Sequence, residues 1–294
     1  MSDMPVSSLV LASVLGHSVL NRPLEDVSPG ALMSIAFAGC ARGSSEFADG
    51  SQYGFKPGIA ILGAYLEPGA NAKFETTLAA NHHYILTAGG SAETADIDLA
   101  VLDTEGNVVC KDTDENPFAG VSVNVGAESE VTYVLANGGS VPTFACMVVL
   151  VNEDGWSIHK QNLDAVIAKV NALETYYSNN DFHFFSGPNT WCLLGGVVKP
   201  DTGFQAKQVT IPAGTHIAMG FGDTQAQDLD LFAHNASGEI VAQDQSDDAT
   251  PAIALESGYS GVTDFTLKNA TGGDALCLLT IFEKGGDQRR GRRN

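Results

Sequence analysis

Two pairs of aspartates have a spacing that suits metal binding. In Asp96-Ile97-Asp98-Leu99 and in Asp228-Leu229-Asp230-Leu231, the aspartates are separated by one residue. On a β-strand such residues place their side chains on one face, where the two carboxylates repel each other unless a cation neutralises them. Calcium accepts about six to eight oxygen ligands, including carboxylates. The sequence therefore predicts a calcium site in each segment, with the candidate ligands Asp96, Asp98 and Asp112 in the first and Asp228, Asp230 and Asp244 in the second.

The same aspartates also have a structural interpretation. Aspartates beside turns often accept hydrogen bonds from neighbouring backbone amides, and a polar strand face can be solvated. No EF-hand loop is present to fix a ligand set. The sequence leaves both interpretations open.

No residues form a catalytic pattern. The chain contains neither H-E-x-x-H nor G-x-S-x-G, and no nucleophile and base stand at a recognisable spacing. The seven histidines show no ligand spacing, and we expect His82, His83 and His216, near the starts of two strands, at the surface. We predict a non-catalytic protein with no catalytic residues and no cofactor apart from calcium.

Aromatic residues are concentrated between positions 176 and 191. Such a cluster can stack on sugar rings or seat a partner, but it can equally pack a helix against a sandwich. We expect the packing role for this cluster, whose members are Tyr176, Tyr177, Phe182, Phe184, Phe185 and Trp191.

An internal repeat organises the chain. At an offset of 132 residues, 11 of the 51 positions from 62 to 112 are identical to their counterparts. The identities fall on turn glycines, on strand hydrophobics and on the paired aspartates, which makes a duplicated unit the natural explanation. We predict a first unit at 1–154 and a second at 155–284, with β bodies at about 60–152 and 192–283, followed by a disordered basic tail at 285–294.

Each unit reads as a helical lead-in followed by short strands. Apolar residues at helical spacing predict helices in the N-terminal segment around Val6–Val14, over 31–38 and around 163–177, the last capped by Asn162 or Asp164. Alternating strands with glycine turns follow, as at 97–102 and 229–234. The predicted fold is mainly β, with two tandem antiparallel jelly-roll-like β-sandwiches.

The two Asp-x-Asp-Leu segments, each followed by a turn ending in Gly106 or Gly238 and by an apolar strand, resemble bacterial pre-peptidase C-terminal domains. The resemblance covers about 62–151 and 194–283 and implies non-catalytic jelly-roll sandwiches of exported proteins, some of which bind calcium or a polymer. No protease accompanies them in this chain, and the helical lead-ins are not part of the family's pattern.

Composition excludes several classes of protein. The net charge of −20 disfavours binding to nucleic acid, and no apolar run approaches the roughly 20 residues that span a membrane. Five cysteines without C-x-x-C spacing argue against a zinc site, and we expect Cys146 and Cys277 in the core.

Together these features predict an extracellular or cell-surface protein, although no signal peptide is visible. We expect it to bind a protein or a polysaccharide. The alternative is a self-assembling subunit of a surface layer or filament.

Overall fold

The structure is a computed structural model that describes residues 29–91, 95–187 and 190–285. Within these residues, both units contain one helix followed by nine strands, in the same order. The first unit consists of α1 (Pro29–Asp49), β1 (Tyr53–Phe55), β2 (Ile61–Leu66), β3 (Asn71–Leu78), β4 (His82–Gly90), β5 (Ile97–Leu102), β6 (Val108–Asp112), β7 (Phe118–Val125), β8 (Ser129–Asn137) and β9 (Thr143–Asn152). The second consists of α2 (Lys160–Ser178), β10 (Phe182–Phe184), β11 (Trp191–Val198), β12 (Thr202–Ile211), β13 (His216–Gly222), β14 (Ala226–Asn235), β15 (Ile240–Asp244), β16 (Ala252–Leu255), β17 (Gly261–Gly272) and β18 (Ala275–Lys284).

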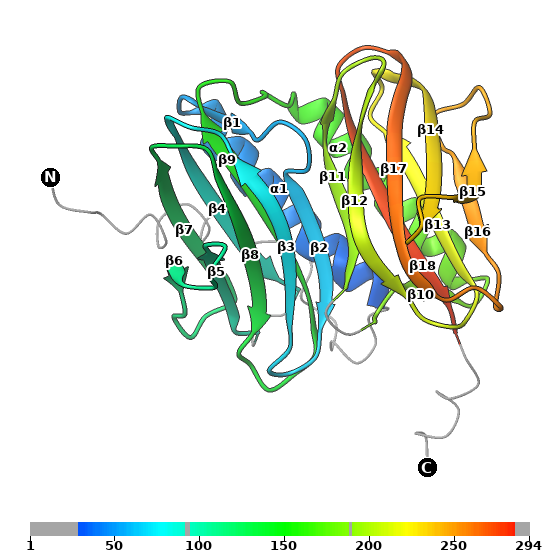
Figure 1. The fold of residues 1–294 in the computed structure, drawn as a ribbon, viewed down its shortest axis with the longest axis horizontal. Helices are drawn as coiled ribbons and strands as arrows, with labels where there is room; N and C mark the ends of the chain where they lie inside the picture. The colour runs from blue at the N-terminus through cyan, green and yellow to red at the C-terminus, as the bar shows by residue number, and fades with distance from the viewer. Residues whose placement is uncertain (1–28, 92–94, 188–189, 286–294) are drawn as a thin grey trace, which may run out of the picture.

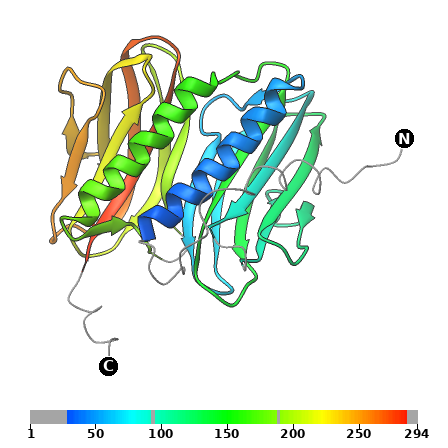
Figure 2. The same ribbon diagram turned by 180° about the vertical axis from the view of Figure 1, so that it is seen from behind.

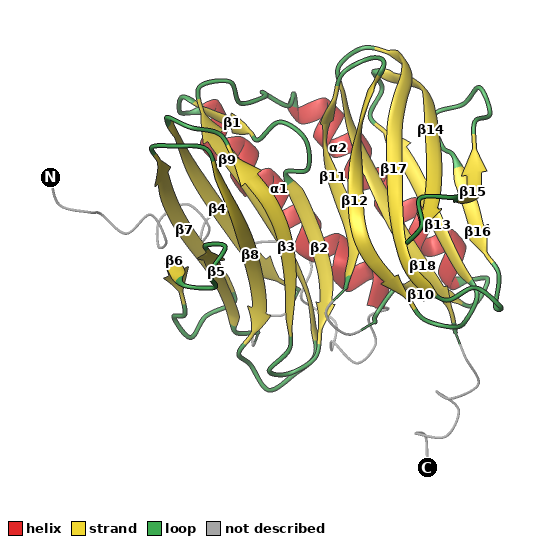
Figure 3. Ribbon diagram, viewed as in Figure 1, coloured by secondary structure: helices red, strands yellow, loops and turns green. Residues whose placement is uncertain are grey.

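The elements form three layers (Figures 1 and 3). The middle layer is a ten-stranded antiparallel sheet, called the large sheet, with the path β16-β13-β18-β11-β2-β9-β4-β7. On one side lie two four-stranded sheets, called sheet B (β3-β8-β5-β6) and sheet C (β12-β17-β14-β15). The two helices lie side by side on the opposite side (Figure 2). The fold is therefore mainly β, with two tandem sandwiches, as the sequence predicts.

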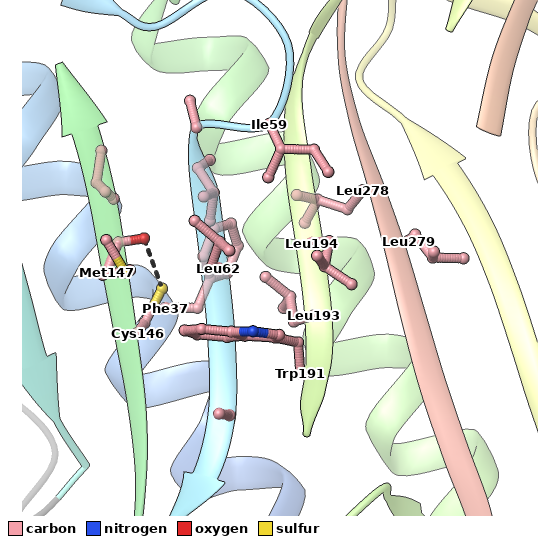
Figure 4. Packing of buried hydrophobic residues seen from close by; sticks show 14 of the residues in the cluster. Phe37, Ile59, Leu62, Cys146, Met147, Trp191, Leu193, Leu194, Leu278 and Leu279 are labelled. Atoms are coloured by element: carbon pink, nitrogen blue, oxygen red, sulfur yellow. Dashed lines mark hydrogen bonds between the residues drawn. The ribbon is translucent and has the colours of Figure 1, made fainter. Parts of the chain in front are cut away.

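The two units join through one continuous sheet, which the sequence does not reveal. β2 pairs antiparallel with β11, and Leu62 lies opposite Leu194. These two leucines are equivalent at the 132-residue offset, and the flanking pairs Ile61–Gly195 and Gly63–Leu193 are also exchanged by that offset. The register therefore defines a pseudo-two-fold axis through Leu62 and Leu194, which lie on neighbouring strands in Figure 4.

Burial on both faces explains why the central strands read as continuous apolar runs. The helices cover one face and the small sheets the other, so nine of the ten residues of β9 are buried. Cys146 and Cys277 are completely buried in this core, as predicted. Burial raises the pKa of Cys277 to about 12, which leaves its thiol protonated and unreactive at neutral pH.

The helices differ from their predictions in extent and capping. α1 continues eleven residues past the predicted end at Ala38, because its next turns also face the core: Cys40 is buried and its thiol donates to the carbonyl oxygen of Cys146 at 3.0 Å. α2 has the predicted apolar face but begins at Lys160, after His159, whose side chain makes no capping hydrogen bond. The prediction of Asn162 or Asp164 as the cap is therefore wrong: both lie inside the helix, and Asp164 accepts hydrogen bonds from Arg42 of α1 instead.

The predicted helix around Val6–Val14 and the basic tail beyond Gly285 lie outside the described residues. The predicted unit boundary at 154/155 falls in the segment between β9 and α2.

Candidate functional site

The paired aspartates lie at the starts of β5 and β14, on the outer faces of sheets B and C. One carboxylate oxygen, Oδ1, is buried without a hydrogen-bond partner in Asp96 and again in its counterpart Asp228. Burial, followed by the charge of Asp96, raises the pKa of Asp98, and partial burial, followed by the charge of Asp230, raises the pKa of Asp228. Each pair is therefore a place where negative charge is poorly compensated.

The surroundings of the two aspartate pairs differ. Asp230 is only 8% exposed, and its Oδ2 lies 4.0 Å from the ammonium group of Lys268. In the first unit the carboxylates of Asp96 and Asp98 face the backbone of Gly138, where an added Cβ would lie 2.6 Å from Asp96 Oδ2. Glycine at this position leaves room beside the carboxylates.

Asp112 and Asp244 have the structural role that the sequence left open. Oδ2 of Asp112 accepts from the amide of Gly120 and Oδ2 of Asp244 from that of Ala252, both at 2.9 Å. Burial alone would raise the pKa of Asp244, but hydrogen bonds from Ala252 and Ser246 lower the pKa of this carboxyl overall. Each aspartate thereby ties β6 or β15 to the start of the following strand.

Among residues 29–91, 95–187 and 190–285, no three histidine, cysteine, aspartate or glutamate side chains come together in a group that could hold a metal ion. Calcium binding at the six aspartates therefore stays a prediction.

His216 corrects the expectation of surface histidines. It is 2% exposed and packs edge-on against the ring of Phe185, and burial lowers its pKa. The counterpart of His216 is Tyr84, which is also buried, so this position belongs to the core in both units. His82 and His83 are partly buried.

The aromatic cluster has the packing role that we expected. Tyr177, Phe184, Phe185 and Trp191 are buried, and the ring of Tyr177 lies 4.5 Å from that of Phe282 on β18. Tyr176 alone among the six is strongly exposed, at 63%. The cluster packs α2 against the large sheet, and its buried rings are not available to stack on a sugar.

A shallow groove of about 310 Å³ lies on sheet C and is lined by residues of β12, β14, β17 and the turn before β12. Strand register places its side chains in rows: Thr266 lies between Gln205 and Phe232, and Lys268 lies between Gly203 and Asp230. The inward residues of these strands fill the core, so the alternation of each strand turns the groove residues outward.

The composition of the groove suits a polar ligand with apolar faces. Phe232 offers a partly exposed ring, and Gln205 and Thr266 offer hydrogen-bonding groups. Lys268 offers ammonium donors, whose ion-pair partner among the described residues is Asp230, at 4.0 Å. Gly203 adds no side chain to its row, and an added Cβ would lie 2.5 Å from the carbonyl oxygen of Leu267.

Sheet B lacks this arrangement. At the 132-residue offset, alanines stand in place of Phe232 and Lys268, and Lys73 stands in place of Gln205; the two alanines are Ala100 and Ala136. Three of the side chains that line the groove therefore have no equivalent on sheet B.

Sequence reasoning missed the groove because its residues come from three strands and match no motif. It also missed Asn137 and Asn269, which are identical at the repeat offset and buried. The side-chain amide of Asn137 donates to the carbonyl oxygens of Leu66 and Val141, and that of Asn269 donates to those of Val198 and Gly273. Extending the repeat alignment beyond residue 112 would have identified this pair.

Comparisons with known proteins give no family. No protein-family model matches the chain, and no curated protein matches it in sequence. Similar solved structures include PliG of Aeromonas hydrophila, a periplasmic inhibitor of g-type lysozyme (TM-score 0.25, 10% identity, 31% of this chain and 86% of that one). The CBM22-1–CBM22-2 tandem domain of Paenibacillus barcinonensis Xyn10C (TM-score 0.22, 7% identity) is matched over 80% of this chain and 93% of that one. The PBSX exported protein XepA (TM-score 0.21, 14% identity) is matched over 76% and 86%, respectively.

These TM-scores are too low to bear on function, and the resemblance to pre-peptidase C-terminal domains stays a prediction. In the part of the chain that the structure describes, neither helix is long and apolar enough to cross a membrane.

Proposed function

We propose that this protein is a non-catalytic binding protein of the cell surface or extracellular space, and that its second unit binds a neutral polysaccharide in the groove of sheet C. The observation that carries the proposal is the partly exposed ring of Phe232 beside the polar side chains of Gln205, Thr266 and Lys268. Sugar rings present apolar C–H faces and hydroxyl groups together, and aromatic rings with nearby polar groups complement both.

The shape and charge of the groove favour a long, uncharged ligand. The groove is shallow and open, so it suits a segment of a polymer better than a small molecule that must be enclosed. Its single ammonium group has Asp230 nearby, and the chain carries a net charge of −20. A protein with this charge repels polyanions at long range.

Affinity electrophoresis tests this function directly. The protein is run through native gels that contain a neutral glucan, mannan or xylan, or an anionic polysaccharide such as alginate. We expect at least one neutral polymer to retard the protein and alginate to leave its mobility unchanged. Phe232→Ala and Lys268→Ala should each weaken the retardation roughly tenfold, the equivalent of about 1.4 kcal/mol.

The first unit provides a matched control. Lys73 is exposed and occupies the position of Gln205 on sheet B, so Lys73→Ala should bind like the unmodified protein, whereas Gln205→Ala should bind more weakly. The proposal fails if no neutral polymer retards the protein, or if Phe232→Ala is retarded as strongly as the unmodified chain.

Calcium is the second part of the proposal. The unpartnered Oδ1 atoms of Asp96 and Asp228 and the raised pKa values of Asp98 and Asp228 suit a nearby cation. Asp112 and Asp244 suit it less, because backbone amides already engage their carboxylates.

Thermal unfolding in EGTA and in millimolar calcium tests this part independently of the polysaccharide. Calcium at about 100 times its dissociation constant would stabilise the fold by about 2.7 kcal/mol. Asp228→Asn should reduce this gain, and in EGTA it should raise the midpoint slightly by relieving repulsion. Equal midpoints with and without calcium would refute calcium binding.

A further inference from the structure

The two ends of the molecule expose the same apolar residues. Seven large hydrophobic side chains are exposed among the described residues, and four of them form two equivalent pairs. Val108 and Val109 on β6 are 56% and 49% exposed, and their counterparts Ile240 and Val241 on β15 are 52% and 38% exposed. Figure 1 shows β6 and β15 near opposite ends of the longest axis.

Each of these pairs lies on a strand whose outer edge is unpaired in the described structure. β6 is the last strand of sheet B and β15 the last strand of sheet C. Beside them, β7 and β16 are the two free edges of the large sheet. We call β6 with β7, and β15 with β16, the two open ends.

The two edge strands of the large sheet, β7 and β16, carry no protection within their own sequences, although Pro117 and Pro251 precede them and the neighbouring strands β6 and β15 contain Lys111, Asp112 and Asp244. Edge strands normally carry charges or prolines that prevent pairing with other chains. The eight residues of β7 and the four of β16 contain neither charge nor proline, in a chain of which 17% is charged. The amides of Gly120 and Ala252 already donate to the carboxylates of Asp112 and Asp244, so another strand would pair along the rest of each edge, around Ser122 and Ala254.

The topology of the large sheet allows a second copy of this chain to continue it. The path from β16 to β7 contains eight strands, and every neighbouring pair is antiparallel. With an even number of alternating strands, β16 and β7 run in opposite directions. A copy displaced along the sheet thus brings its β16 antiparallel to β7, without any change of orientation.

The molecule already contains one junction of this kind. Its own two units meet through the antiparallel edge pairing of the equivalent strands β2 and β11. We propose that the open ends dock a second copy of the same chain, so that copies associate end to end into an open-ended chain held by edge pairing and by the four exposed aliphatic residues. Because each molecule has two such ends, the contact does not close on itself.

A second copy is the occupant that the symmetry favours. An unrelated partner would need to recognise both ends separately, whereas a copy supplies an equivalent apolar pair and an equivalent free edge at every contact. One pair of aliphatic side chains at each end makes a small interface, so the association should be weak and should depend strongly on protein concentration.

Sedimentation velocity over about 1–500 µM protein, a range suited to weak interfaces, tests the proposal. We expect the weight-average mass of the full chain to rise above that of a dimer at the highest concentrations. Replacing all four aliphatic residues by threonine keeps their β-branched shape and the net charge. This quadruple variant should raise the dissociation constant of the end-to-end contact at least tenfold. Its substitutions are Val108→Thr, Val109→Thr, Ile240→Thr and Val241→Thr.

A matched control variant shows whether association depends on the residues of the open ends or on exposed hydrophobic residues in general. Val141 and Val262 are 38% and 40% exposed but lie on none of the strands β6, β7, β15 and β16, so Val141→Thr with Val262→Thr should associate like the unmodified chain. A second test places lysines on the free edges through the exposed Ser122 and Ala254; Ser122→Lys with Ala254→Lys should also abolish growth. A constant 30.7 kDa monomer at all concentrations, or undiminished growth in both end variants, would overturn the proposal.

Discussion

The buried asparagines Asn137 and Asn269 allow one interaction to be measured twice in the same molecule. Each occupies the same place in its unit and donates two hydrogen bonds, of 3.1 and 2.8 Å, to carbonyl oxygens outside its own strand. They differ at the side-chain oxygen. Oδ1 of Asn137 accepts from the amide of Gly139 at 3.0 Å, whereas Oδ1 of Asn269 is buried without a partner.

This difference sets the expected magnitudes. A buried hydrogen bond contributes about 1 kcal/mol net, and a group left unpaired by a mutation costs about 1–3 kcal/mol. Asn137→Ala removes three bonds and should destabilise the protein by about 3 kcal/mol. Asn269→Ala removes two bonds and also eliminates an unpaired oxygen, so its cost should stay at or below about 2 kcal/mol.

Urea unfolding followed by circular dichroism measures both costs. The unfolding midpoint should shift for each variant while the m-value stays constant, which shows that native stability has changed. Asn137→Asp serves as a control for size, because it keeps the shape of the side chain but has no amide donors. At pH 7 it should cost at least as much as alanine, and at pH 4 less, because a protonated carboxyl can donate one bond.

The test compares the loss of stability in Asn137→Ala with that in Asn269→Ala. If Asn269→Ala proves more costly than Asn137→Ala, counting hydrogen bonds does not explain the role of these residues. Costs below about 0.5 kcal/mol for both would show that water replaces the lost bonds.

Three further predictions concern the junction of the units and the core. Gly196→Ala places a Cβ 1.8 Å from the carbonyl oxygen of Gly58, so it should cost at least about 1–3 kcal/mol; an unchanged thermal midpoint would contradict this. Because burial lowers the pKa of His216, the unfolded state binds more protons below about pH 6.5, and stability should fall as the pH drops from 7.5 to 5. His216→Gln should reduce that slope in urea midpoints, and an identical slope would refute the assignment. Arg42 bonds Asp164 at 2.8 Å on a half-exposed surface, so Arg42→Ala should cost at most about 1 kcal/mol, and 0.5 M salt should erase the difference through screening; a loss above about 2 kcal/mol would show that the pair is stronger than an exposed one.

The sequence predicts strands of the small sheets well, because buried and more exposed residues alternate along them, as in β5 and β8. The segment 97–102 was predicted from its alternation, and β5 has that extent with its odd-numbered residues buried. The helix around 163–177 was predicted from its apolar spacing, and α2 buries that face. The end of α1 was missed because its last turns contain Gly39 and Gly43, which weaken a helical pattern although tertiary packing retains the helix.

The arrangement of the units and the groove could not be predicted in the same way. The equivalence of Leu62 and Leu194 was visible in the repeat, but a single sequence does not say that two equivalent edge strands pair with each other. The groove depends on Phe232, Thr266 and Gln205 being adjacent across three strands, which follows from register and not from spacing along the chain. The sequence predicts Asp112 and Asp244 as calcium ligands with bonding to backbone amides as the alternative, and only the structure shows that amides donate to their carboxylates.

The fusion of two related units into one chain also has an evolutionary consequence at the junction. In a dimer of identical chains, a mutation beside the symmetry axis appears on both sides at once, and both copies must tolerate it. Here Ala64 of β2 has the counterpart Gly196 in β11, where an added Cβ would meet the carbonyl oxygen of Gly58. Covalent linkage has freed each half to change alone, so one half can specialise while the other preserves the inherited scaffold.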